Sequence, residues 1–131
     1  HLARHKHADL FIDTFNYNAH TTASDALWAG LPIVTKQGKQ FSARVTSSLL
    51  TTCGLPELIT KNEKEYEDLI YELATNSKKL KTISLKLSEN KKNNPLFNTK
   101  QYTNNFENGL QKAYDLYFNG EYPKNIFVNE N

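Results

Sequence analysis

Short apolar runs alternate with segments of helical pattern in the first half of the chain, and this alternation limits the possible folds more than any other feature. Runs at 9–14, 32–35 and 58–60 have the length and makeup of buried strands. Between them, residues 22–29 and 41–53 have the spacing of helices. Asp9 and Asp13 stand near the ends of the first run and are expected to mark where it meets solvent. Strands joined by helices form parallel sheets, so we expect an open α/β sheet.

The second half of the chain has helical periodicity only. Residues 63–76 carry apolar side chains at i, i+3, i+4 and i+7, and 77–90 repeat the pattern more weakly. After a polar break ending at Pro95, another helix is expected from Thr99. Residues 1–62 are therefore interpreted as a βαβα segment, 63–118 as a helical extension of the same lobe, and 119–131 as a loose tail. The expected core includes Trp28 and a stripe on the last helix: Tyr102, Phe106, Leu110, Ala113 and Tyr117.

Composition limits the function classes. A chain of 131 residues with 38% hydrophobic residues suits one compact core. Its formal charge of +2 argues against a nucleic-acid or membrane-surface binder. The lone Cys53 permits no internal disulfide, which fits a cytoplasmic location. It also has no His nearby in the sequence that could activate it, so we do not expect it to act as a nucleophile. Because the sequence starts at His1 and has no Met, we expect a fragment of a longer protein.

Polar residues gather where the first helix begins, after the loop 15–20. Ligands of parallel sheets bind at the carboxyl ends of the strands, and a helix amino terminus there attracts anions such as a diphosphate. Thr22 and Asp25 also have the spacing of an approximate capping box. Spacing alone leaves two interpretations open, an anion site and ordinary helix caps.

Several stretches, in order and at the expected spacing, match one known family. They are 8–14, His20-Thr21-Thr22, Asp25-Ala26-Leu27-Trp28-Ala29-Gly30, 32–35, 42–45, 54–59 and 95–102. Over about residues 1–118 the chain resembles the catalytic region of the O-GlcNAc transferases, specifically its C-terminal part and the bacterial type. The resemblance implies a GT-B architecture of two Rossmann-like lobes, with this chain as the later part of the donor-binding lobe plus a helical extension. It also implies tetratricopeptide repeats and an N-terminal lobe elsewhere in the protein.

The resemblance further implies roles for single residues. His1 and Arg4 would lie near the uridine of a UDP-sugar, and Asp25 at the ribose hydroxyls. Leaving-group stabilisation at the diphosphate would fall to His20, Thr21 and Thr22. The implied reaction is inverting transfer to Ser or Thr hydroxyls of acceptor proteins, without a metal or another cofactor. No general base is assigned, and the isolated chain is expected to be inactive because a GT-B site needs both lobes.

Two departures and two alternatives accompany this interpretation. Asn16 stands where many bacterial relatives have Pro, and Ala19 where Gly is common, which puts the loop geometry in doubt. His20 favours UDP-GlcNAc, since fucosyl-transferring relatives tend to lack this His. The alternatives are a non-catalytic scaffold derived from a transferase lobe, and a metal site. The candidate metal ligands are His1, His5, His7 and His20.

Overall fold

A parallel three-stranded sheet lies at the centre of the fold. The computed structural model describes residues 1–128. The strands are β1 (Phe11–Ile12), β2 (Ile33–Lys36) and β3 (Ile59–Thr60), in the order β1-β2-β3. Phe11 pairs with Ile33 and Thr35 with Ile59, both in parallel register. The expected α/β fold with a parallel sheet is therefore confirmed.

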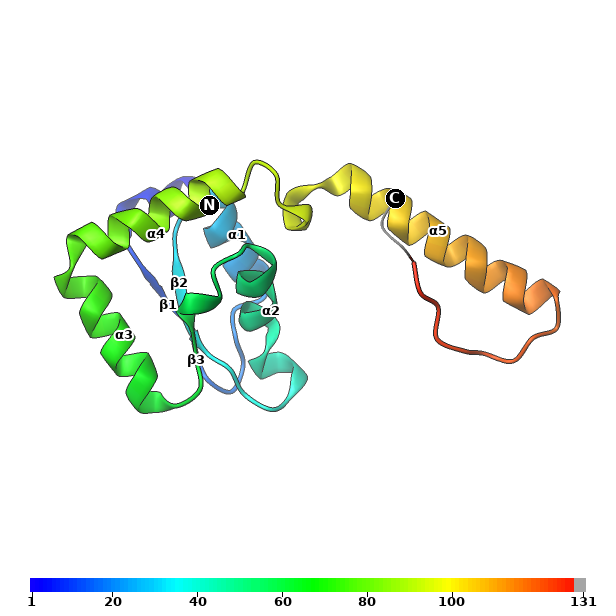
Figure 1. Ribbon diagram of the computed structural model, residues 1–131, viewed down its shortest axis with the longest axis horizontal. Helices are drawn as coiled ribbons and strands as arrows, with labels where there is room; N and C mark the ends of the chain where they lie inside the picture. The colour runs from blue at the N-terminus through cyan, green and yellow to red at the C-terminus, as the bar shows by residue number, and fades with distance from the viewer. Residues whose placement is uncertain (129–131) are drawn as a thin grey trace. The chain divides into compact units, whose positions relative to one another are not determined.

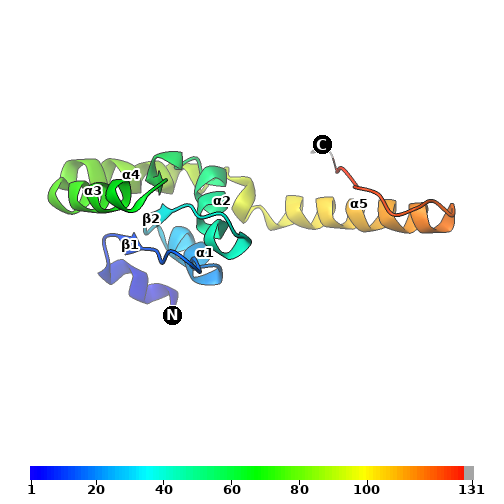
Figure 2. The same ribbon diagram turned by 90° about the horizontal axis from the view of Figure 1, so that it is seen from below.

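Helices cover both faces of this sheet. Helix α1 (Thr21–Ala29) connects β1 to β2, and α2 (Val45–Thr52) connects β2 to β3. Figure 1 shows these two helices on one side of the strands and α3 (Glu63–Thr75) on the other. Helix α4 (Ser77–Asn90) lies beside α3, as Figure 2 shows from below. The two successive βαβ connections thus place their helices, α1 and α2, on the same face of the sheet.

Four 3-10 helices complete the described elements: η1 (Leu2–His7), η2 (Phe41–Ala43), η3 (Pro56–Leu58) and η4 (Pro95–Phe97). One of them corrects an expectation, because the helix predicted over 41–53 is interrupted. Residues 41–43 form η2, and Arg44 leaves helical geometry with φ −127° and ψ −3° before α2 begins. The break occurs where the chain bonds back to the loop after β1, through the Ser42 carbonyl.

The core lies between the sheet and its helices. Leu27, Ile33, Leu50 and Leu73 are fully buried there. Two core assignments from the sequence are wrong. Trp28 is half exposed, and α5 (Thr99–Phe118) buries none of its side chains; its stripe residues Tyr102, Phe106, Leu110 and Tyr117 are all exposed. A helical period identifies a face that is able to pack, but it does not identify what covers that face.

Packing divides the chain into two compact units, His1–Leu96 and Phe97–Asn131. The second unit contains α5 and a segment without regular secondary structure over 121–128. In this unit Lys112 Nζ donates to the Phe127 carbonyl, 2.8 Å away. The boundaries at residues 62 and 118 stay predictions, and 129–131 of the predicted loose tail lie outside the described residues.

The predicted capping box is also wrong. Helix α1 begins one residue earlier than expected, at Thr21, and its N-cap is His20, which makes no side-chain capping bond. Thr22 and Asp25 therefore both lie inside the helix. Because Asp25 does not cap α1, its carboxylate is available for other partners.

Candidate functional site

An open pocket of about 470 Å³ lies where β1 ends and α1 begins. Among its lining residues are three for which the family resemblance implies a place at a diphosphate: His20, Thr21 and Thr22. The first N–H groups of a helix have no partners within the helix and carry partial positive charge. Two threonine hydroxyls on an exposed first turn add further donors. The pocket can therefore accept an anion.

His20 has an aromatic environment. Its imidazole stacks on the Tyr17 ring, with a centroid distance of 4.6 Å and an interplanar angle of 18°. The Phe41 ring meets it edge-on at 6.1 Å and 83°. His20 Nε2 lies 3.4 Å from the Ser42 carbonyl oxygen. The orientation of the imidazole is thus set by η2 as well as by its own loop.

A second group of predicted site residues lies on the adjoining surface, where η1 packs against α1. His1 Nε2 is 3.5 Å from Asp25 Oδ2, and Arg4 Nη2 is 3.1 Å from His1 Nδ1. All three side chains are at least partly exposed. The structure therefore brings the predicted uridine and ribose residues together. They do not line the 470 Å³ pocket, but Asp25 lies one helical turn beyond Thr21 and Thr22.

Asp13 holds the loop after β1 in place, a role that the sequence did not predict. It was expected at a solvent boundary, yet it is only 3% exposed. Its Oδ1 accepts hydrogen bonds from the backbone N–H groups of Thr14 (2.9 Å) and Ala19 (2.7 Å). Its Oδ2 accepts from the Thr35 hydroxyl at 2.7 Å. The sequence did carry one signal for this role, because Asp13 directly follows the first strand and precedes the loop that leads to the first helix.

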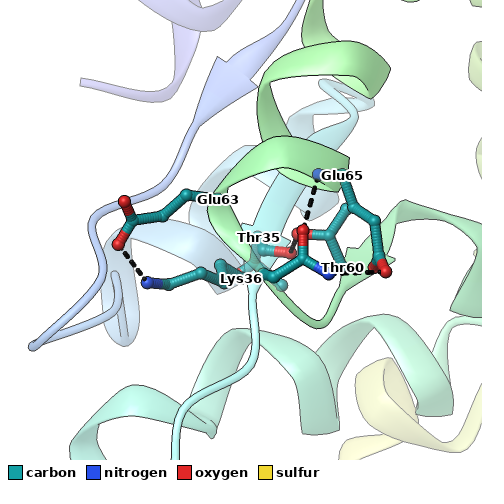
Figure 3. A network of polar contacts seen from close by, with 6 residues as sticks. Thr35, Lys36, Thr60, Glu63 and Glu65 are labelled. Carbon is teal, nitrogen blue, oxygen red and sulfur yellow. Dashed lines mark hydrogen bonds and ion pairs between the residues drawn. The ribbon is translucent and has the colours of Figure 1, made fainter.

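The Asp13 network continues across the sheet. The Thr60 hydroxyl donates to the Thr35 carbonyl at 3.0 Å, which links β3 to β2 as Figure 3 shows. In the same view, Lys36 Nζ lies 3.0 Å from Glu63 Oε1 at the start of α3. The loop that carries His20 is thus tied by one buried carboxylate to Thr35 of β2, and Thr35 is bonded in turn to β3.

The same loop is also held by residues 40–46, the segment that contains η2. Asn18 is buried, its backbone N–H donates to the Ser42 carbonyl at 2.8 Å, and its side-chain amide donates to the Thr14 carbonyl at 2.7 Å. The Thr46 hydroxyl donates to the Ala19 carbonyl at 2.9 Å. The Asn16 carbonyl accepts from Gln40 Nε2 and the Ser42 hydroxyl. Asn16 and Ala19 stand where many relatives have Pro and Gly. In this chain, side chains that donate to the carbonyl groups of these two residues hold the loop in place.

Tyr66 braces the same region from α3. Its hydroxyl donates to the Asp13 carbonyl at 2.5 Å, and its ring meets Phe15 edge-on at a centroid distance of 5.0 Å. Burial, with a smaller contribution from the Asp13 charge, raises the pKa of Tyr66 to about 12.

This pKa predicts a loss of stability in alkali. The unfolded phenol ionises near its ordinary pKa of about 10, so above that pH the unfolded state releases a proton that the folded state keeps until about 12. The contribution is fully present below about pH 10 and is lost as the pH rises toward 12. Urea unfolding at about pH 9 and about pH 11 should show a larger drop for the wild type than for Tyr66→Phe. Equal drops would contradict the assignment.

The described residues give no support to the metal-site alternative. Within 1–128, no three His, Cys, Asp or Glu side chains are grouped so that they could hold an ion. His1 and His5 contact each other edge-on at 5.5 Å, while His20 stacks on Tyr17. Cys53 is buried, and burial raises the pKa of its thiol to about 11, which leaves little thiolate at neutral pH.

Comparisons with known proteins give a consistent picture. The model of glycosyl transferase family 41 matches residues 1–106. A probable UDP-N-acetylglucosamine–peptide N-acetylglucosaminyltransferase SEC from Arabidopsis thaliana is 35% identical over 132 residues, covering 100% of this chain and 14% of the relative. The UDP-N-acetylglucosamine–peptide N-acetylglucosaminyltransferase of Caenorhabditis elegans is 34% identical over 120 residues, covering 92% of this chain and 10% of the relative. This chain therefore spans a small part of the length of both relatives.

A solved structure is similar as well. That of an O-GlcNAc transferase mutant from Thermobaculum terrenum aligns with a TM-score of 0.73 and 33% sequence identity. The alignment covers 86% of this chain and 21% of that chain. Separately, every helix within residues 1–128 is too short or too polar to cross a lipid bilayer.

Proposed function

This chain belongs to glycosyl transferase family 41, and on that basis we propose that the protein containing it transfers GlcNAc from UDP-GlcNAc to Ser and Thr hydroxyls of other proteins. The resemblance to O-GlcNAc transferases is confirmed, and so is the fold, a partial Rossmann-like lobe of the GT-B type. The chain contributes part of the donor site. The observation that carries the proposal is the pocket at the start of α1, which combines His20, Thr21 and Thr22 inside the matched residues.

In this proposal the pocket binds the diphosphate of the donor. Bond cleavage makes UDP the leaving group, so negative charge grows on the diphosphate in the transition state. Donors already aimed at that position stabilise the charge without reorganising, which lowers the barrier. The hydroxyls and N–H groups of Thr21 and Thr22 and the imidazole of His20 supply these donors.

The nucleoside would bind along the adjoining surface. Asp25 offers carboxylate oxygens to the two ribose hydroxyls, and such charge-assisted bonds are stronger than neutral ones. His1 and Arg4 would contact the uracil. Their proximity in the structure, 3.5 Å between His1 and Asp25 and 3.1 Å between Arg4 and His1, supports a shared ligand.

The remaining parts of the proposal concern the whole protein. Acceptor proteins, an N-terminal catalytic lobe and tetratricopeptide repeats are its proposed partners, and the cytoplasm its proposed location. The reaction is proposed to need neither a metal ion nor another cofactor. The general base would come from outside this chain.

The donor is tested with radiolabelled UDP-GlcNAc, UDP-glucose and GDP-fucose on the full-length protein and a mixture of acceptor proteins. We expect incorporation from UDP-GlcNAc at a rate on the order of ten-fold or more above the other donors, the size that one or two lost hydrogen bonds would give. Preference for GDP-fucose would overturn the donor assignment. No incorporation from any donor would instead favour the scaffold interpretation.

A further inference from the structure

Tyr17 and Phe41 are large aromatic residues that the fold leaves on the surface. Tyr17 is 65% exposed and Phe41 is 75% exposed, so neither contributes a core side chain. Both contact the same imidazole, that of His20. Tyr17 also lines the pocket at the start of α1. An exposed aromatic pair around one histidine needs a reason other than burial.

The backbone holds both rings in place. The Thr14 hydroxyl donates to the Tyr17 carbonyl at 2.5 Å, and the next residue, Asn18, donates its N–H to the Ser42 carbonyl. That carbonyl follows Phe41 directly in η2, and it also lies 3.4 Å from His20 Nε2. The loop after β1 and η2 therefore position the two rings relative to each other before any ligand arrives.

The contacts restrict how His20 can turn. A parallel stack at 4.6 Å fixes the plane of the imidazole, and the edge contact with Phe41 limits tilting. Since a carbonyl oxygen only accepts hydrogen bonds, the contact with Ser42 uses a proton on Nε2 and leaves Nδ1 for a contact outside the loop. Nδ1 donates to a diphosphate oxygen in the imidazolium form, in which both ring nitrogens carry protons.

We propose that Tyr17 and Phe41 form an aromatic clamp that orients the His20 imidazole toward a diphosphate leaving group at the start of α1. The clamp rests on the proposed transferase function, and it assigns two positioning residues that do not themselves touch the reacting atoms. Catalysis gains when a donor needs no reorientation as charge develops. Tyr17 acts through its ring, because its hydroxyl has no part in the stack.

The test compares Tyr17→Ala with Tyr17→Phe in the full-length protein. Tyr17→Ala should lower kcat with UDP-GlcNAc by roughly 2- to 10-fold, the size of one lost aromatic contact, while KM changes little. Tyr17→Phe, which keeps the ring, should restore kcat. Phe41→Ala should behave like Tyr17→Ala. Tyr71→Ala, at a tyrosine that is 71% exposed on α3, is the matched control and should leave kcat unchanged.

A second measurement is independent of turnover. In spectra of protein labelled at histidine, the His20 ring protons should be shifted upfield by the stacked Tyr17 ring. The shift should persist in Tyr17→Phe and disappear in Tyr17→Ala. If the wild type turns over and Tyr17→Ala matches its kcat, the clamp is overturned, and a kcat loss in Tyr17→Phe equal to that in Tyr17→Ala also overturns it. An inactive wild type would defeat the transferase proposal, and the spectra would still decide whether Tyr17 orients His20.

Discussion

Replacing Asp13 with alanine is expected to lower the free energy of unfolding of this chain by about 3 kcal/mol, because a buried charged acceptor of three hydrogen bonds is removed. The N–H groups of Thr14 and Ala19 and the hydroxyl of Thr35 would lose their acceptor. Thr35 is fully buried and cannot turn to water. The expected loss exceeds that for a surface acid by several-fold.

The measurement is urea unfolding followed by tryptophan fluorescence, since Trp28 lies on α1, the helix that follows the braced loop. Asp13→Asn keeps the size of the side chain and one carbonyl oxygen, so it should cost less, about 1 to 2 kcal/mol. Asp9→Ala is the matched control, because Asp9 is exposed and precedes the same strand; its change should stay within about 0.5 kcal/mol. A loss for Asp13→Ala as small as the control's would show that the loop holds without the carboxylate.

Local signals made several elements predictable. The helix expected over 63–76 is observed at Glu63–Thr75, and the one expected over 77–90 is observed at Ser77–Asn90. Both begin at an asparagine cap, Asn62 and Asn76, whose side chain accepts a backbone N–H three residues on. Apolar period and cap residue lie within one turn of each other in sequence, so they can be read without knowledge of the fold.

Features that depend on distant partners could not be read in this way. Asp13 is buried because Thr35, 22 residues later, and Tyr66, 53 residues later, both bond to it. The break at Arg44 arises where the chain bonds back to the loop after β1. The aromatic stripe of α5 showed a regular period, yet nothing in a period specifies a covering surface.

The candidate site follows the same division. The resemblance selected the residues, but only the fold shows that His1, Arg4 and Asp25 lie together, and that His20 stacks on Tyr17. The contact between His1 and Asp25 depends on how η1 packs against α1. The two residues are 24 positions apart in different elements, so no helical or strand period in the sequence predicts that they meet. The stack similarly depends on the turn that Asp13 and Asn18 stabilise.

Asp25→Ala should weaken UDP binding by roughly 10- to 150-fold, or about 1.5 to 3 kcal/mol, because the ribose hydroxyls lose a charged acceptor. The structure sharpens this prediction, since α1 has His20 as its N-cap and Asp25 is its fifth residue, too far along the helix to belong to a capping box. Its side chain is 33% exposed, so removing it opens no cavity, and folding should change by less than about 1 kcal/mol. A large loss of affinity with little loss of stability is therefore the expected signature.

Calorimetry with UDP on the full-length protein measures the affinity, and thermal unfolding measures the stability. Asp25→Asn keeps one oxygen acceptor without the charge and should give an intermediate affinity. His1→Ala should reduce affinity less than Asp25→Ala, because its contact with Asp25 spans 3.5 Å and its imidazole is half exposed. Salt should weaken binding only modestly in the wild type, since a partly buried contact is screened less than a surface one. If UDP binds equally well to Asp25→Ala and the wild type, Asp25 has no part in the donor site, and the grouping with His1 and Arg4 is then only a surface contact between η1 and α1.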